Sequence, residues 1–192
     1  FSEATSYHRL PGLTDGKTRY QRAVYSPDSS KLLACGSQGE IQIWDLRSRQ
    51  FRNIESGAEF IAALSWTRDG RQFAASLAPK HVALVWDAET LEVQHRLEGH
   101  FEVIGAIDFS PDGRRIFTAD VRGSMKIWDG NSAAEVLSLR APIGTMNEAF
   151  FSEDGLSIVG SSGGRIVVWD ASSGYEAARR LEGRLNSVRE TD

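Results

Sequence analysis

The sequence contains little cysteine: one residue, Cys35, among 192. An internal disulfide and a CxxC metal pair are therefore both excluded within this chain. We interpret the thiol of Cys35 as a small buried apolar group in a strand. Long apolar runs are lacking as well, since no stretch approaches the roughly 18 residues that a membrane-spanning helix needs. Because the chain begins with Phe1 rather than Met, we expect it to be a fragment.

Positive charge is not in excess either. The chain has 22 Lys and Arg against 26 Asp and Glu, a net charge of −4, so it has no overall positive field with which to hold nucleic acid or an anionic membrane surface. We therefore expect neither as a partner. The composition, 41% hydrophobic and 25% charged, is typical of a globular protein with a packed core, and we expect a cytoplasmic location.

Signatures of catalysis and of cofactor binding are missing from the sequence. It has no GxSxG, Walker or dinucleotide-binding motif, and the glycine-rich "GSSGGR" at 160–165 lacks the lysine and the following helix that would hold a phosphate. The four histidines lie on separate segments without an HExxH partner. They are His8, His81, His95 and His100. We predict that the chain is not an enzyme and binds no cofactor and no metal.

Two short motifs recur in step along the chain. A Trp-Asp pair occurs at 44–45, 86–87, 128–129 and 169–170, and its tryptophans are 42, 42 and 41 residues apart. A second motif keeps the same phase, as "SPDS" at 26–29, "TRDG" at 67–70, "SPDG" at 110–113 and "SEDG" at 152–155. A constant period of this length indicates that one structural unit is stacked several times.

Each repeat is typical of four short antiparallel strands. Ser or Thr followed by Pro, Asp and Gly is the chemistry of a type I turn, which joins two strands tightly. An apolar strand precedes this turn, the strand with Trp-Asp follows it at a distance, and a more polar strand closes the unit, as in "EVQHRLE" at 92–98. Four strands fill a period of this length and leave no room for a helix, so we predict an all-β chain.

The Trp-Asp pairs, the "SPDG" turns, the "LEGH" at 97–100 and the period resemble the WD-repeat family over residues 20 to 183. This resemblance implies a β-propeller, in which four-stranded antiparallel blades are arranged radially. Four blades would be half of a seven- or eight-bladed ring. The regular short connections resemble WD-repeat segments of bacterial proteins.

The repeat also predicts how the chain is divided within one propeller domain. We assign 1–19 to the trailing strand of a preceding blade and a connector. Blades one to four are expected at 20–57, 58–99, 100–141 and 142–183. Residues 184–192 are a tail or the start of a next blade.

The resemblance implies structural roles for the recurring residues. Large flat tryptophan side chains would fill the gaps between neighbouring blades; these are Trp44, Trp86, Trp128 and Trp169. The aspartates that follow would close each strand by accepting hydrogen bonds from the backbone of the next turn; these are Asp45, Asp87, Asp129 and Asp170.

The family often joins a histidine, a Ser or Thr, a turn aspartate and the tryptophan in one hydrogen-bond network inside a blade. Here only Gly99-His100 keeps the Gly-His pair, and six residues before Trp128 the sequence has Arg122 rather than Asp. We therefore predict that no blade assembles the full network. We interpret His100 as a structural hydrogen-bonding residue rather than a base.

Two functions fit the resemblance. The first is a protein-protein interaction scaffold without chemistry of its own. The second is a sensory or scaffolding domain of a larger bacterial signalling enzyme, such as a protein kinase, whose catalytic part lies outside this chain. A propeller enzyme with a central active site has the least support, since no convergent acid, base or metal set is visible.

The expected binding surface is the rim formed by the turns between second and third strands and by the loops that lead to the next blade. Apolar and basic groups gather there; they are Phe60, Lys80, His81, Phe101, Arg122 and Ile143. Our hypothesis is that an acidic or apolar peptide docks here, with Lys80 and Arg122 supplying charge and Phe101 an anchor. The alternative is that Phe60 and Phe101 begin inner strands and are buried. A second copy of the chain, closing an eight-bladed ring, is a further candidate partner.

Overall fold

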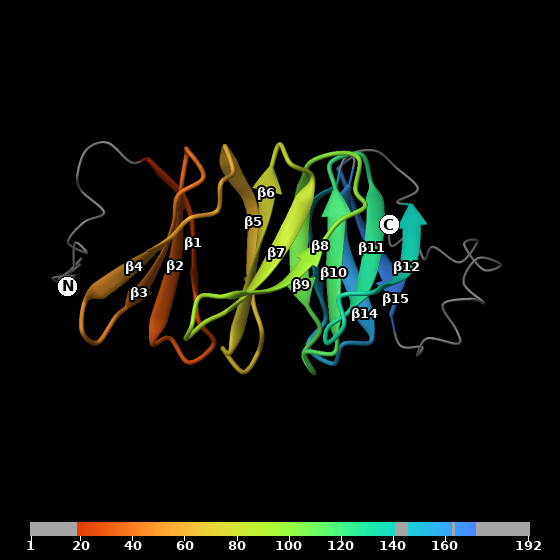
Figure 1. Ribbon diagram of the computed structural model, residues 1–192. Coiled ribbons are helices and arrows are strands. Elements are labelled where there is room, and N and C mark those ends of the chain that lie inside the picture. Colours follow the sequence, from red (N-terminus) through yellow and green to blue (C-terminus); the bar gives the residue numbers. More distant parts are fainter. Residues whose placement is uncertain (1–18, 141–145, 163, 172–192) are drawn as a thin grey trace, which may run out of the picture.

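The computed structural model describes residues 19–140, 146–162 and 164–171. In these ranges the chain forms strands and turns and no helix (Figure 1). The strands belong to four antiparallel sheets, and in each sheet they pair in chain order. The predicted all-β class is therefore confirmed, and we call the four sheets blades 1 to 4.

The strands of each blade follow one another with short connections. Blade 1 consists of β1 (Tyr20–Tyr25), β2 (Lys31–Gly36), β3 (Ile41–Asp45) and β4 (Gln50–Ile54). Blade 2 consists of β5 (Phe60–Trp66), β6 (Gln72–Ala78), β7 (Val82–Asp87) and β8 (Val93–Leu97). Blade 3 consists of β9 (Ile104–Phe109), β10 (Arg115–Asp120), β11 (Ser124–Asp129) and β12 (Glu135–Arg140).

Blade 4 is described over three strands, β13 (Met146–Phe151), β14 (Ser157–Ser162) and β15 (Arg165–Asp170). The polar fourth strand expected before 183 lies outside the described residues. So do the trailing strand and connector expected at 1–19, apart from Arg19, and the tail at 184–192. The number of blades in a complete ring stays a prediction.

The turn between the first and second strand of each blade is held by a serine or threonine hydroxyl. In blade 1, Ser26 Oγ donates to Asp28 Oδ1 at 2.7 Å and accepts from the Lys31 backbone N–H at 2.8 Å. The Ser26 hydroxyl, together with the backbone and hydroxyl of Ser30, lowers the pKa of Asp28 to about 2. The same arrangement recurs in blade 3 at Ser110 and Asp112. The repeat of this motif in the sequence therefore reflects one local hydrogen-bond pattern.

The last residue of this turn has a left-handed backbone. Its φ is 69° at Gly70, 70° at Gly113 and 69° at Gly155, but blade 1 places Ser29 there with φ 58°. A side chain in this region costs roughly 1 kcal/mol, whereas glycine adopts it freely. Blade 1 therefore carries a local strain that the other three turns avoid.

We expect Ser29→Gly to raise the free energy of unfolding, by less than about 1 kcal/mol because glycine also gains entropy in the unfolded chain. The matched change is Gly113→Ser, whose added Cβ would meet no atom within 4 Å, so that backbone strain is its main cost. It should lower stability by about 1 kcal/mol. Urea unfolding measures both, and a loss of stability in both variants would contradict the turn assignment.

Neighbouring blades are joined by apolar cores between their sheets. One core contains Leu33 and Ile43 of blade 1 together with Phe73 and Trp86 of blade 2. The next joins blades 2 and 3 around Trp128, and a third joins blades 3 and 4, with Trp169 packed against it. In each case the tryptophan faces the preceding blade. This places the blades in chain order, as Figure 1 shows from the red to the blue end.

The first strands of blades 2, 3 and 4 are also joined by a carboxylate. Asp108 on β9 accepts a hydrogen bond from Ser65 Oγ on β5 at 2.8 Å and another from the Phe151 backbone N–H on β13 at 2.9 Å. Burial raises the pKa of Asp108. One side chain thus ties three neighbouring blades together along the edge formed by their first strands.

Candidate functional site

The Trp-Asp aspartates lie where their strands end. Asp45 Oδ1 accepts from the Ser48 backbone N–H at 2.7 Å, and Asp87 Oδ1 accepts from that of Thr90 at 2.8 Å. Asp129 Oδ1 accepts from the Ser132 backbone at 2.8 Å. These contacts lower the pKa of Asp45 and of Asp87, because hydrogen bonds from the turn stabilise the carboxylate. Asp170 ends β15 in the corresponding place.

Blade 3 contains a buried hydrogen-bond network around His100. Its Nδ1 lies 3.2 Å from Asp120 Oδ2 and its Nε2 lies 2.7 Å from Thr118 Oγ1. The indole Nε1 of Trp128 donates to the same Thr118 oxygen at 2.8 Å. Histidine, threonine, aspartate and tryptophan are thus joined within one blade. The prediction that no blade assembles the full network is therefore wrong.

The network was not predicted because the turn aspartate was expected at position 122, where the sequence has Arg122. Asp120 is the last residue of β10, two residues before Arg122, and its Oδ1 accepts from the backbone N–H groups of Arg122 and Ser124. The carboxylate therefore holds the turn and the histidine at once. The "TAD" at 118–120, which ends a strand 18 to 20 residues after His100, was the sequence signal that could have identified it.

The chemistry of the donors determines where the protons lie. An indole N–H only donates, so Thr118 Oγ1 accepts from Trp128 and its own proton is available for His100 Nε2. His100 Nε2 therefore accepts a hydrogen bond from the Thr118 hydroxyl. His100 Nδ1 carries the ring proton and donates a hydrogen bond to the Asp120 carboxylate. The side chains of His100 and Asp120 are 0% and 3% exposed. No substrate can reach this pair from solvent in this conformation, so its role is to fix the blade.

Removing the Thr118 hydroxyl tests this role. Thr118→Val keeps the shape of the side chain but leaves the Trp128 indole N–H and His100 Nε2 buried without a partner, so the free energy of unfolding should fall by about 1–3 kcal/mol. Thr118→Ser retains the hydroxyl and should lose clearly less. Thermal unfolding compares the two variants. Equal losses would show that the methyl group, and not the network, matters.

The buried His100 also predicts that the free energy of unfolding depends on pH. Burial lowers the pKa of His100 below its usual 6.5, although the Asp120 carboxylate acts in the opposite direction. Between the folded and unfolded pKa values the unfolded chain binds a proton that the folded chain does not. The free energy of unfolding should therefore fall as the pH drops below about 6.5.

Urea titrations at pH 7.5 and pH 5.0 measure this loss. His100→Gln should be less stable at pH 7.5, but its stability should change less between the two pH values, because the remaining titratable groups are the same. An identical pH-dependent loss in both proteins would exclude His100 as the source.

Blade 1 holds its tryptophan differently. Trp44 Nε1 donates to Gln42 Oε1 at 3.1 Å, and the hydroxyl of Tyr20 donates to the same oxygen at 2.7 Å. The amide group of Gln42 donates in turn to Asn53 at 3.0 Å. Trp44 also stacks on Phe51 with 4.6 Å between ring centroids. These glutamine contacts were not anticipated from the sequence, because Gln42 lies outside the recurring motifs.

Four of the six residues expected on the rim lie on loops at one end of the sheets, and Phe60 begins β5 at that same end. Lys80 and His81 occupy the β6–β7 turn and Arg122 the β10–β11 turn, while Phe101 lies on the loop from β8 to β9. The Val121 backbone N–H donates to Val103 at 2.9 Å, which joins that loop to the β10–β11 turn. In an antiparallel sheet the β6–β7 turn and the last residue of β8 lie at the same end of the strands. The fold therefore brings these segments to one face.

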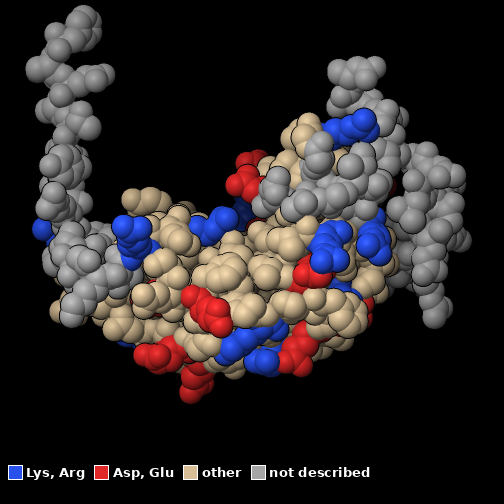
Figure 2. Space-filling model, turned by 90° about the horizontal axis from the view of Figure 1, so that it is seen from above, with Lys and Arg blue, Asp and Glu red and all other residues tan. Residues whose placement is uncertain are grey.

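This face is exposed and carries mixed charge. β10 and β12 point to the upper edge of Figure 1, so the view from above in Figure 2 looks onto it and shows basic and acidic side chains among uncharged ones. Arg122 Nε lies 2.9 Å from Glu102 Oε1. Phe101 is 88% exposed and Phe60 38%, so the alternative that both are buried is wrong, although Phe60 does begin an inner strand, β5. Ile143 lies outside the described residues.

Within residues 19–140, 146–162 and 164–171, no three His, Cys, Asp or Glu side chains gather as a metal would require. His81 and His95 lie on different segments of blade 2, and His8 precedes the described residues. The part of the chain that the structure describes has no helix able to cross a membrane.

The model of the family "WD domain, G-beta repeat" (WD40) matches residues 15–45 and 91–129. This chain is similar to WD40 repeats over these two segments. The second WD40 match includes β8, the outer strand of blade 2, and ends with β11 of blade 3. The sequence repeat is therefore offset from the sheet by one strand.

Several curated proteins are similar in sequence to this chain. The chain is 25% identical over 162 residues to human apoptotic protease-activating factor 1, covering 76% of this chain and 13% of that protein. It is 29% identical over 117 residues to the Drosophila melanogaster protein groucho, covering 59% and 16%. It is 32% identical over 131 residues to U3 small nucleolar RNA-associated protein 21 of Saccharomyces cerevisiae, covering 65% and 14%. The chain thus spans 13–16% of the length of these relatives.

Proposed function

We propose that this chain is a protein-protein interaction scaffold that works by presenting a rigid face and performs no chemistry itself. WD40-repeat relatives are typically interaction scaffolds, and among the described residues nothing indicates catalysis. The observation that carries the proposal is the 88% exposure of Phe101 on a loop anchored to a rigid blade. An aromatic side chain held in solvent loses little entropy when a partner covers it.

The partner that suits this face is a linear protein segment with an acidic group next to an apolar one. Lys80 is exposed on the β6–β7 turn, and Arg122, at 74% side-chain exposure, has guanidinium donors to spare beyond its contact with Glu102. An acidic side chain could pair with these cations while an apolar neighbour covers Phe101. The hydrophobic centre and charged edge of such a contact are the usual anatomy of a protein interface.

A second proposal concerns the protein to which the chain belongs. Because the chain spans only 13–16% of the length of the three relatives described above, its blades suit a scaffolding domain within a larger protein. A bacterial signalling enzyme such as a protein kinase is our specific version of this alternative, together with a cytoplasmic location. Kinase motifs in the coding sequence beside these repeats would support it, and a full-length reading frame without them would exclude it.

The face is tested with the double variant Lys80→Glu and Arg122→Glu. Partners captured by the full chain in a pull-down should be lost, because two cations are replaced by repelling carboxylates, while the thermal midpoint should stay unchanged. Phe101→Ala should weaken binding about thirtyfold, on the scale of an interface hot spot.

The matched control is Arg68→Glu with Arg114→Glu, two exposed arginines beside the turns at the opposite end of the sheets. It makes the same change in net charge and should leave binding intact. Retained binding by the Lys80 and Arg122 variant, or equal loss by the control, would remove this face from consideration.

A further inference from the structure

The junction between blades 1 and 2 is held less tightly than that between blades 3 and 4. Arg115, the first residue of β10, donates to the Ala171 carbonyl at 2.6 Å and to the Gly155 carbonyl at 2.9 Å, both in the repeat that follows. Lys31 begins β2 in the same place, but its Nζ lies 3.5 Å from the Ala88 carbonyl. A bidentate guanidinium is thus replaced by a single ammonium at the limit of hydrogen bonding.

The outer strands differ at the same junctions. Leu137 on β12 pairs with Ile127 and packs against the core between blades 3 and 4. The equivalent residue in blade 1 is Arg52 on β4, which pairs with Ile43. Arg52 is exposed, and its Nη1 donates to the Glu89 carbonyl in the β7–β8 turn at 2.8 Å. A charged side chain therefore stands where the other junction has an apolar one.

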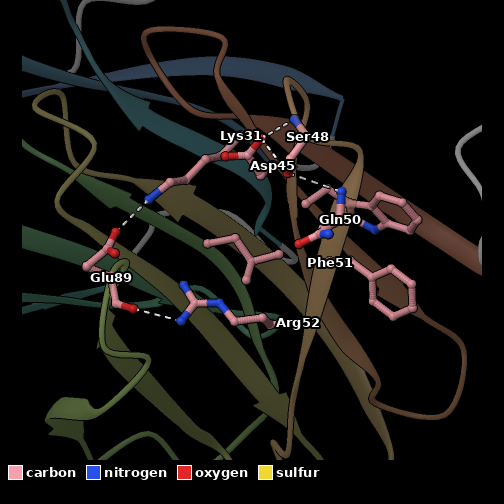
Figure 3. A pocket seen from close by; sticks show the side chains of 9 residues that line it. Lys31, Asp45, Ser48, Gln50, Phe51, Arg52 and Glu89 are labelled. Carbon is pink, nitrogen blue, oxygen red and sulfur yellow. Dashed lines mark hydrogen bonds and ion pairs between the residues drawn. The ribbon is translucent and has the colours of Figure 1, made fainter.

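These two differences leave a cleft of about 250 Å³ between β4 and the β7–β8 turn. In Figure 3, Lys31 and Arg52 both extend from blade 1 toward Glu89, Lys31 to its carboxylate and Arg52 to its backbone carbonyl. Ile43 and Gln50 also line the cleft. The space has the size of one or two side chains, with two cations and the carboxylates of Asp45 and Glu89 in its lining. The Asp45 carboxylate already accepts hydrogen bonds from the Ser48 backbone and hydroxyl in its own turn.

The carboxylate of Glu89, which pairs with Lys31, is weakly held. The carboxylate of Glu89 is 86% exposed, and within the described residues its ion pair is the one with Lys31, at 3.5 Å. An exposed ion pair of this kind contributes between 0 and about 1 kcal/mol. The ammonium of Lys31 and the guanidinium of Arg52 retain donors for a further acceptor. A carboxylate from outside can therefore displace Glu89 at little cost.

We propose that this cleft is a second protein-binding site, which takes an acidic side chain of a linear peptide segment. The carboxylate lies between Lys31 and Arg52 in the place of Glu89, and its methylene groups pack on Ile43 and on the aliphatic stems of the two cations. The cleft lies beside the β7–β8 turn, at the end of the sheets opposite to the face with Phe101. The chain can therefore hold two partners at once.

The experiment uses a library of random linear dodecapeptides displayed on phage, selected against the full chain carrying Lys80→Glu and Arg122→Glu. This background removes the cations of the first face, so the outcome does not depend on the function proposed above. Enriched peptides should contain Asp or Glu, and replacing that residue by Gln or Asn should abolish binding. Affinity should fall as salt rises from 50 to 500 mM, because the contacts are ionic.

Single substitutions should then change the affinity for the peptide in opposite directions. Lys31→Gln and Arg52→Gln should each weaken the synthesised peptide about tenfold. Glu89→Gln should tighten it, because the internal competitor is removed while the cations stay. The matched control is Arg114→Gln, an exposed arginine at the same end of blade 3, which should change nothing. In methyl NMR spectra the peptide should shift the signal of Ile43 and leave its equivalent Ile127 unmoved.

Four results would overturn the proposal: no acidic peptide is enriched, the peptide binds the Lys31 or Arg52 variant undiminished, Glu89→Gln weakens it, or Ile127 shifts instead of Ile43. Thermal midpoints of all variants establish that each is folded. Because the side chain of Glu89 is exposed, Glu89→Gln should fold normally. Its effect on peptide affinity therefore tests the proposal even if the Lys31 or Arg52 variant fails to fold.

Discussion

The whole structure depends on the packing of one sheet's tryptophan face against the preceding sheet. A four-stranded blade has two faces and can cover neither by itself, so each blade is stable only as part of a row. Trp86, Trp128 and Trp169 supply the largest flat surface at the three junctions. The short turns and the aspartates at strand ends matter because they keep these faces in register. The same rigidity lets loops at either end present side chains to a partner.

The blades differ in how they hydrogen-bond their buried polar groups. Blade 3 buries a histidine, a threonine and an aspartate with its tryptophan. Blade 1 uses the amide of Gln42, and Lys31 takes the place that Arg115 has in blade 3. Apolar packing tolerates such variation because it depends on shape and area rather than on particular donors. Departures from the repeat are therefore the places where individual blades can gain separate binding properties.

Much of this fold could be predicted from the sequence because its determinants are local and repeated. The turn motifs and the Trp-Asp pairs fix where strands begin and end, and their common phase gives the sheets. The network in blade 3 was not predicted because its aspartate, Asp120, ends strand β10, whereas the repeat led us to expect it within the turn, at the position of Arg122. The cleft could not be anticipated, since it depends on how far Lys31 and Arg52 reach across a junction. The exposure of Phe101 likewise depends on the path of the β8–β9 loop, which the sequence pattern does not predict.

The offset between sequence repeat and sheet has a consequence for how this chain can be cut or duplicated. A unit bounded by residues 91 and 129 takes β8 from blade 2 and three strands from blade 3. Deleting it would join β7 directly to β12, the strand equivalent to β8, so that β12 would become the outer strand of blade 2. Excision between the loops at 55–59 and 98–103 removes one complete sheet instead. Gene duplication by sequence repeats thus interlocks adjacent blades, since each new unit finishes the previous sheet before it begins its own.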